Sequence, residues 1–410
     1  MVKKAKEFFS TYTLIIVVIF IIISIILLPK ESVDAAYKGL MTWFTIVLPA
    51  LLPFFIGAEL LIGLGVVKFI GILLEPLMRP LFNVPGEGSF AYAMSITSGY
   101  PVGAKIVSRL RKDKVLSTEE AQRLAAFCST SGPLFMLGAV GIGMFKSVEI
   151  GIFIALCHYL GSISVGLLFR FYKSPALNFY SSTRRNIFSA AFKELKATRS
   201  KNPPLGILLG NAVRESLNTL LVVGGFIILF SVIIRVLTTI GIIGILSNFL
   251  LFFLKPLGIT SSLTNGLLTG IFEITLGSKL VAETFSSWIL PKITVAAFII
   301  AWSGLSINAQ AISFISTTDI SAKIYLFSKF LHGIMAAVFT VILFPFFSSK
   351  LQVTKPVFLQ YPVLMMKDRF IQSFLFSMEI FIMIILFLLL VASIIAFFNY
   401  FKMILNYKKR

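Results

Sequence analysis

The sequence predicts an all-α polytopic membrane protein with about eight transmembrane helices, two re-entrant helical hairpins and inverted internal repeats. Three observations predict it: an apolar composition, long runs without charge, and a similarity between the two halves of the chain. The 410 residues are 57% hydrophobic and 13% charged, and their mean hydropathy is +0.95. Soluble domains carry about 25% charged residues. The composition therefore excludes an ordinary soluble enzyme.

Runs without charge that are long enough to cross a hydrocarbon core of about 20 residues predict the individual spans. They cover residues 8–28, 39–58, 124–145, 150–169, 216–234, 293–318, 330–349 and 380–401. The first belongs to an uncleaved anchor helix over residues 1–38, because no small-residue cleavage pattern follows it. The run 236–254 is a candidate ninth crossing, although we favour a helix lying at the interface.

The charge balance sets the orientation of these spans. The chain has 37 Lys and Arg against 17 Asp and Glu, a net charge of +20. Membrane proteins gather basic residues on their cytoplasmic loops. Basic clusters precede the first span, follow residue 108, fill residues 170–201 and end the chain. Both termini are therefore expected in the cytoplasm. We interpret the 170–201 cluster as a topology determinant and expect no nucleic-acid partner.

The chain aligns with itself at a nearly constant offset. A shift of 176 superposes Gly65 on Gly241, and a shift of 174 superposes Gly103-Ala104-Lys105 on Gly277-Ser278-Lys279 and His158 on His332. Repeats at residues 39–172 and 215–347 follow. A basic cytoplasmic linker at 173–214 joins them, and residues 348–410 form a C-terminal loop and transmembrane helix. With three crossings in each repeat, the second copy must enter the membrane from the opposite side, as in many transporters.

Both repeats contain a segment that is moderately apolar but broken. In residues 86–105 the stretch Thr97–Pro101 interrupts the helix, because proline removes a backbone donor and restricts the residue before it. Residues 258–280 are the counterpart. Broken backbone at membrane depth is tolerated where it is buried in protein or lines a polar cavity. We expect two re-entrant hairpins.

The span after each hairpin is interrupted as well, at Cys128–Pro133 and at Trp302–Gln310. Small residues at such points can simply allow close helix packing. Two hairpins and two broken spans in register favour a substrate site instead. The candidate binding residues are Thr97, Ser98, Gly99, Tyr100, Lys105, Ser129, Thr130, Ser131, Gly132, Glu273, Thr275, Gly277, Ser278, Lys279, Ser303, Gly304, Ser306 and Asn308.

Charged residues within the apolar zone are costly and usually mark a pathway. A turn near Leu276-Gly277 would bring Glu273 and Lys279 together as an ion pair. Lys105, in the first hairpin, is a further charge of this kind. His158 and His332 are interpreted as packing residues, with proton relay as the minor alternative. The sequence shows no catalytic, metal or cofactor motif, so neither an enzyme nor a cofactor is expected.

Four stretches carry a family resemblance: Ser98–Lys105, Ser129–Pro133, Gly270–Lys279 and Trp302–Gly304. They resemble the YlbJ-type sporulation integral membrane proteins, which contain nucleoside-recognition or Gate domains. The resemblance makes 39–172 and 215–347 two Gate-type repeats. It implies the stage-V sporulation transporter of dipicolinic acid, and a distant likeness to concentrative nucleoside transporters, whose substrate sits between two hairpins and two broken helices.

The expected function is transport of a small aromatic dicarboxylate, dipicolinate, from the mother cell towards the developing spore. Lys105 and Lys279 are then the expected partners of this anionic substrate. The protein would lie as a multi-pass protein in the mother-cell membrane around the forespore. Its partners would be the anionic substrate and the lipid bilayer, and a homo-oligomer is left open. The alternatives are a carrier of nucleosides or other small solutes, and a non-transporting scaffold that recruits a partner through its basic loop.

Overall fold

The computed structural model describes residues 15–16, 18–173, 187–200, 204–285 and 288–348, and within them every regular element is helical. This confirms the predicted all-α class. The α-helices are α2 (Pro29–Thr42), α3 (Leu48–Gly63), α4 (Val66–Phe82), α5 (Gly88–Ser98), α6 (Val102–Lys112), α7 (Thr118–Phe127), α8 (Val148–Phe169), α9 (Ile187–Ser200), α10 (Leu205–Thr239), α11 (Ile242–Leu254), α12 (Ser261–Phe272), α13 (Ile274–Glu283), α14 (Ile289–Trp302), α15 (Gly304–Ile315) and α16 (Ala322–Phe347).

Three shorter segments complete the order: π-helices η1 (Trp43–Val47) and η2 (Phe135–Phe145), and the 3₁₀ turn η3 (Lys255–Leu257). Polar side chains cap the N-termini of several helices. Ser117 and Glu120 form a capping box at α7, and Ser147 and Ser321 cap α8 and α16. A capping side chain satisfies backbone donors that a helix start leaves unpaired.

The described residues contain four helices long and apolar enough to cross a membrane, or six if each of two bent pairs counts as one crossing. The four lie within α8, α10, α14 with α15, and α16. The protein is therefore a polytopic membrane protein. The predicted span 380–401 and the segment 348–410 lie outside the described residues, apart from residue 348, as does much of the span 8–28.

The two halves of the chain share one order of elements. The segment 29–63, made of α2, η1 and α3, has the same length as α10 and lies 176 positions before it. The next helix in each half, α4 or α11, follows a glycine in the left-handed conformation: Gly65 at φ 82° and Gly241 at φ 85°. Hairpin, interrupted helix and long helix then follow in both halves. The shared offset thus extends to backbone conformation.

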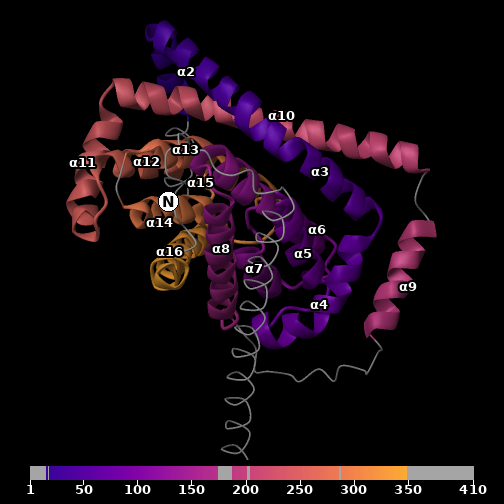
Figure 1. Cartoon of the computed structure of the whole chain (residues 1–410). Coiled ribbons are helices and arrows are strands. Elements are labelled where there is room, and N and C mark those ends of the chain that lie inside the picture. The colour runs from indigo at the N-terminus through magenta and orange to yellow at the C-terminus, as the bar shows by residue number, and fades with distance from the viewer. Residues whose placement is uncertain (1–14, 17, 174–186, 201–203, 286–287, 349–410) are drawn as a thin grey trace, which may run out of the picture.

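The equivalent segments α2–α3 and α10 cross each other in opposite directions, as Figure 1 shows at the top of the molecule. The indole nitrogen of Trp43 donates a hydrogen bond to the carbonyl of Leu220 at 2.9 Å. Gly39 lies against Ser231, and Gly63 lies against Leu208. Equivalent helices that cross in opposite directions are the arrangement that inverted repeats would produce.

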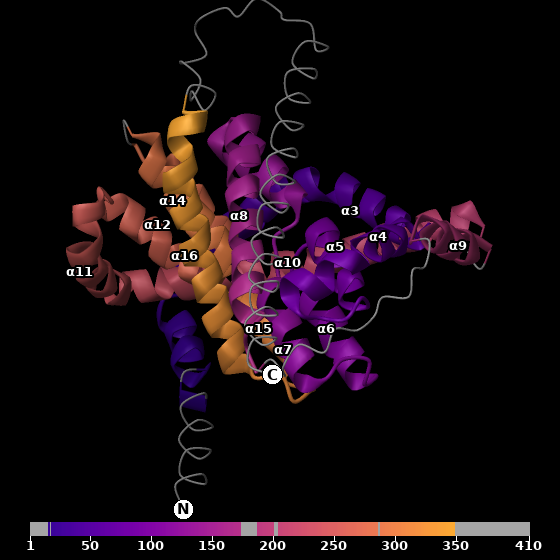
Figure 2. The ribbon, with the colours of Figure 1, turned by 90° about the horizontal axis from the view of Figure 1, so that it is seen from below.

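Helices α8, α14 and α16 pack into the central bundle, with α4 and α11 at opposite ends of the molecule (Figure 2). The bundle is tight where glycine faces the neighbouring backbone, as Gly161 of α8 does against Ala336 of α16. The run 236–254 is not one straight span, because α10 ends at Thr239 and α11 begins at Ile242. Helix α11 then makes a 119° bend with α12. Its depth in the membrane stays a prediction.

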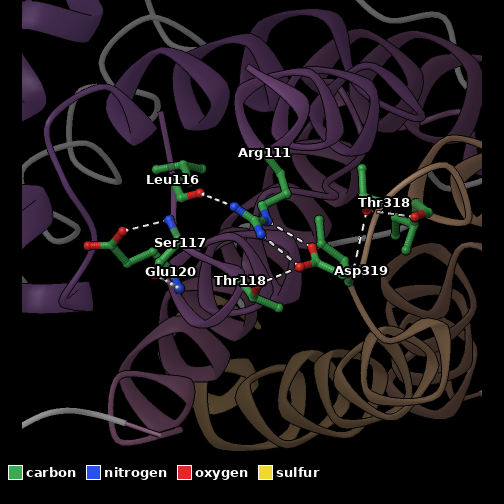
Figure 3. Close-up of polar contacts among 9 residues, drawn as sticks. Arg111, Leu116, Ser117, Thr118, Glu120, Thr318 and Asp319 are labelled. Carbon is green, nitrogen blue, oxygen red and sulfur yellow. Dashed lines mark hydrogen bonds and ion pairs between the residues drawn. The ribbon is translucent and has the colours of Figure 1, made fainter. Parts of the chain in front are cut away.

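An ion pair also joins the two halves outside the spanning helices (Figure 3). The guanidinium of Arg111, at the end of α6, makes two bonds of 2.8 and 2.7 Å to the Asp319 carboxylate. The Thr118 hydroxyl donates to the same carboxylate at 2.6 Å. The Arg111 guanidinium therefore holds the pKa of Asp319 well below its usual range. This contact fixes the turn between α15 and α16 against the first half.

Candidate functional site

A cavity of about 690 Å³, open solvent included, lies where the two hairpin tips and the two interrupted spans meet. Its wall is lined by Val47, Leu51, Phe55, Thr97, Ser98, Gly99, Tyr100, Ser131, Gly132, Leu134, Phe135, Val223, Phe226, Ile227, Glu273, Ile274, Thr275, Ser306, Ile307 and Gln310.

Positions that the self-alignment makes equivalent line the cavity from both halves of the chain. Val47 and Val223 are 176 positions apart, and so are Leu51 and Ile227. Gly99 and Glu273, at the two hairpin tips, are 174 positions apart. The cavity therefore lies at the contact between the two halves.

The first hairpin tip contributes hydroxyl groups. Helix α5 ends at Ser98, and Gly99 takes a φ of 75° that side chains rarely adopt. A Cβ at Gly99 would lie 2.7 Å from the amide nitrogen of Gly132, so glycine lets the tip approach the broken span. The Ser98 hydroxyl is buried and has no hydrogen-bond partner among the described residues. It is a free polar group on the cavity wall.

The first interrupted span is an extended stretch between α7 and η2. Its hydroxyls are used internally: Ser129 Oγ bonds the Tyr325 hydroxyl at 2.8 Å, and Thr130 Oγ1 bonds Ser95 Oγ at 2.8 Å. The amide of Ser131 donates to His158 Nε2 at 3.0 Å. Ser131 and Gly132 face the cavity, whereas Ser129 and Thr130 hold the stretch in place.

The second hairpin breaks at Glu273, whose side chain accepts the Leu276 amide at 2.7 Å and caps α13. The predicted ion pair between Glu273 and Lys279 is wrong. Leu276 and Gly277 lie inside α13 rather than at a turn, and the Lys279 ammonium donates to Thr42 Oγ1 at 3.4 Å. Residues six positions apart on one straight helix do not face each other.

The second interrupted span turns at two consecutive left-handed residues, Ser303 and Gly304. Ser303 has a φ of 71°, and its hydroxyl donates to Asn308 Oδ1 at 3.1 Å. The Asn308 amide returns a bond to the Trp302 carbonyl at 3.0 Å. Ser303 and Asn308 therefore stabilise the break and do not line the cavity. Ser306 and Gln310, on α15, do line it.

Half of the residues predicted for the site line the cavity. Those that do are Thr97, Ser98, Gly99, Tyr100, Ser131, Gly132, Glu273, Thr275 and Ser306. Those that do not are Lys105, Ser129, Thr130, Gly277, Ser278, Lys279, Ser303, Gly304 and Asn308. Lys105 is exposed on α6, and Gly277 is a packing residue against Gly270. The two lysines expected to meet an anion are thus not at the cavity.

A lysine that the sequence analysis omitted lies behind the cavity wall. Lys329 of α16 is fully buried, and its ammonium nitrogen lies 4.8 Å from the centre of the Tyr100 ring. The predicted span of the second repeat begins at residue 330, directly after Lys329, whereas α16 begins at Ala322. A charged residue inside an apolar helix was the signal that could have identified it.

The two aligned histidines contact each other. His332 Nε2 donates to the carbonyl oxygen of His158 at 2.8 Å, and the ring centres are 4.5 Å apart. Each histidine therefore packs against the residue that the self-alignment makes equivalent to it. Among the described residues, no group of three His, Cys, Asp or Glu side chains could hold a metal ion.

The comparisons with known proteins agree with this architecture. The chain is 44% identical to the sporulation integral membrane protein YlbJ of Bacillus subtilis (strain 168) over 329 residues, 79% of this chain and 80% of that protein. The chain belongs to the YlbJ family. Residues 44–148 also match the Gate family, described as nucleoside recognition. That match covers η1 to the start of α8, which includes the first hairpin and the first interrupted span. No solved structure matches the chain significantly.

Proposed function

We propose that this YlbJ-family protein is a carrier that moves a small aromatic dicarboxylate, dipicolinate, from the mother cell towards the developing spore. The observation that carries the proposal is the cavity between the two halves of the chain, lined by both hairpin tips and both interrupted spans. Substrate sites of secondary transporters lie at such repeat interfaces. The sporulation protein that this chain resembles supports the biological setting.

The cavity suits a flat aromatic acid. Val47, Leu51, Phe135 and Phe226 supply apolar wall for a ring, while hydroxyls from the hairpin tip and the interrupted spans supply donors for carboxylate oxygens. Binding sites for small molecules combine these two kinds of wall. In the proposed cycle no covalent chemistry occurs, and the protein is not an enzyme.

Alternating access would come from movement of one repeat against the other about the cavity. The crossing of α2–α3 with α10 in opposite directions supports inverted repeats, and the turns at Gly99 and Glu273 support re-entrant hairpins. Both termini would face the cytoplasm of the mother cell, and the protein would lie in its membrane around the forespore.

Vesicles that contain only this protein test the proposal. Labelled dipicolinate should enter them in a saturable manner, well above vesicles without protein. The Lys105→Met variant is the matched control, because Lys105 is exposed and outside the cavity. It should transport as the wild type does. Uptake no greater than in protein-free vesicles would refute the dipicolinate carrier.

A nucleoside carrier is the second candidate, and the match of residues 44–148 to a family described as nucleoside recognition favours it. Unlabelled uridine and adenosine, added in the same assay, separate the two. Dipicolinate uptake that resists a hundredfold excess of nucleoside supports the first proposal. Uptake of labelled nucleoside in the absence of dipicolinate uptake would establish the second.

Labelling from each side tests the inverted arrangement. Arg109 and Glu283 are exposed, equivalent positions near the ends of α6 and α13. Single cysteines there, in a background without the buried Cys128 and Cys157, should react with an impermeant reagent from opposite sides of the membrane. Reaction of both from the same side would exclude inverted repeats.

A further inference from the structure

Three acceptors surround the buried ammonium of Lys329. The nitrogen lies 2.6 Å from the Ser129 carbonyl, 3.3 Å from the Tyr100 hydroxyl and 3.4 Å from His332 Nδ1. The Ser129 carbonyl belongs to the interrupted span, and Tyr100 belongs to the hairpin tip. One side chain therefore contacts both parts of the first repeat that line the cavity.

The donor and acceptor roles of these neighbours bear on the protonation state of Lys329. His332 Nε2 must carry a proton, because it bonds a carbonyl oxygen, so Nδ1 of the neutral ring accepts. The Tyr100 hydroxyl donates to the Ile300 carbonyl at 2.8 Å, so its oxygen accepts from the lysine. Three acceptors match the three donors of an ammonium group and exceed the two of an amine. This donor count favours the charged form of Lys329 in this arrangement.

This positive charge has no ion-pair partner in the described part of the chain. The pairs Arg109–Asp113 and Arg111–Asp319 do not involve Lys329. Glu273, the carboxyl on the cavity wall, accepts the Leu276 amide instead. The other titratable side chains around it, Tyr100, Tyr325, His158 and His332, are uncharged in this hydrogen-bond arrangement. An unpaired charge in a protein interior costs free energy. A negatively charged ligand nearby would offset that cost.

We propose that Lys329 determines the preference of the cavity for anions, acting across the Tyr100 ring that separates its ammonium from the substrate. The inference rests on the proposed function, since it assigns the charge of that substrate. Lys329 is then a specificity residue that does not touch the ligand. It takes the role that the sequence analysis gave to Lys105 and Lys279. Burial strengthens its effect, because a charge acts further where little water screens it.

Two probes of the same shape isolate the effect of charge. Dipicolinate is a dianion, and pyridine-2,6-dicarboxamide is its neutral analogue. Purified full-length protein in metal-free buffer is titrated with each by calorimetry. The wild type should prefer the dianion. Lys329→Met should weaken dianion binding about tenfold or more and change diamide binding less than twofold. Lys329→Gln keeps a donor without the charge and should behave in the same way.

Lys105→Met removes the same charge from an exposed site and should leave both affinities unchanged. Equal losses for both probes in the Lys329 variants would show a structural role and overturn the inference. Unchanged dianion affinity would overturn it as well. If the variants do not fold, the affinities of the wild type for the two probes are compared. Equal affinity for the dianion and the diamide refutes charge selection. A wild type that binds neither probe refutes the proposed function itself, which is a distinct result.

Discussion

The two repeats share a backbone but differ in where they carry charge. At the hairpin tips, Gly99 of the first repeat corresponds to Glu273 of the second. On the long helices that pack against each other, Ala155 of α8 corresponds to Lys329 of α16. Both buried charges near the cavity therefore come from the second repeat. Equivalent positions of the two halves therefore differ in their chemistry around the cavity.

The interruptions of the two spans differ in the same way. The first is an extended stretch over Cys128–Pro133, whose carbonyls and amides bond Lys329, His158 and Tyr159. The second is a short left-handed turn at Ser303 and Gly304, stabilised by Asn308 from the helix that follows. The long interruption forms backbone hydrogen bonds with other helices, whereas the polar groups of the short one bond within the same span. Of these three partners, Lys329 comes from the second repeat, and His158 and Tyr159 come from α8 of the first.

The largest expected effect tests what the repeats share. A Cβ at Gly103 would overlap the carbonyl of Cys128, and one at the equivalent Gly277 would overlap the backbone of Gly270. Gly103→Val and Gly277→Val should each destabilise the protein by about 1–3 kcal/mol or more, because overpacking forces the backbone apart. Thermal unfolding in detergent measures this. Gly244→Val, which faces open space in α11, is the control, and a tolerated valine at either tight position would contradict the close packing.

The next effect separates serines that face the cavity from serines that hold the backbone. Ser98→Ala should weaken dipicolinate binding up to about tenfold, the value of one hydrogen bond. It should leave stability unchanged, because the hydroxyl has no partner among the described residues. Ser303→Ala should do the reverse. It should cost about 1 kcal/mol of stability through the lost bond to Asn308 and leave affinity within twofold. Identical behaviour of the two variants would refute this division.

The smallest expected effect concerns the ion pair that joins the repeats. Because Arg111 depresses the pKa of Asp319 in the folded protein, the carboxylate stabilises the fold above the ordinary aspartate pKa of about 4. This contribution is lost as the pH falls through the lower folded value. Asp319→Asn should lower the unfolding temperature slightly at pH 7, and the difference from the wild type should shrink below pH 4. A difference independent of pH would show that the charge of Asp319 contributes nothing.

The positions of the interruptions were predictable, because proline, glycine and clustered hydroxyl residues disturb a helix by local chemistry. Thr97–Pro101 and Cys128–Pro133 are examples, and the structure breaks its helices at both. The turn of the second hairpin was misplaced by three residues or more, since Gly277 suggested a turn where it serves close packing against Gly270. A glycine in sequence does not say whether it provides a turn or a contact.

The sequence by itself determined the all-helical membrane class and the family, because these follow from composition and from order along the chain. Only the tertiary structure decided which polar residues share a cavity. Lys329 and Tyr100 are 229 positions apart, and their contact depends on how α16 packs beside the first hairpin. Charge-free runs identify helices that can enter a membrane, but a charge becomes tolerable inside one only through partners from distant segments. For that reason composition predicted the spans and could not predict the lysine within one of them.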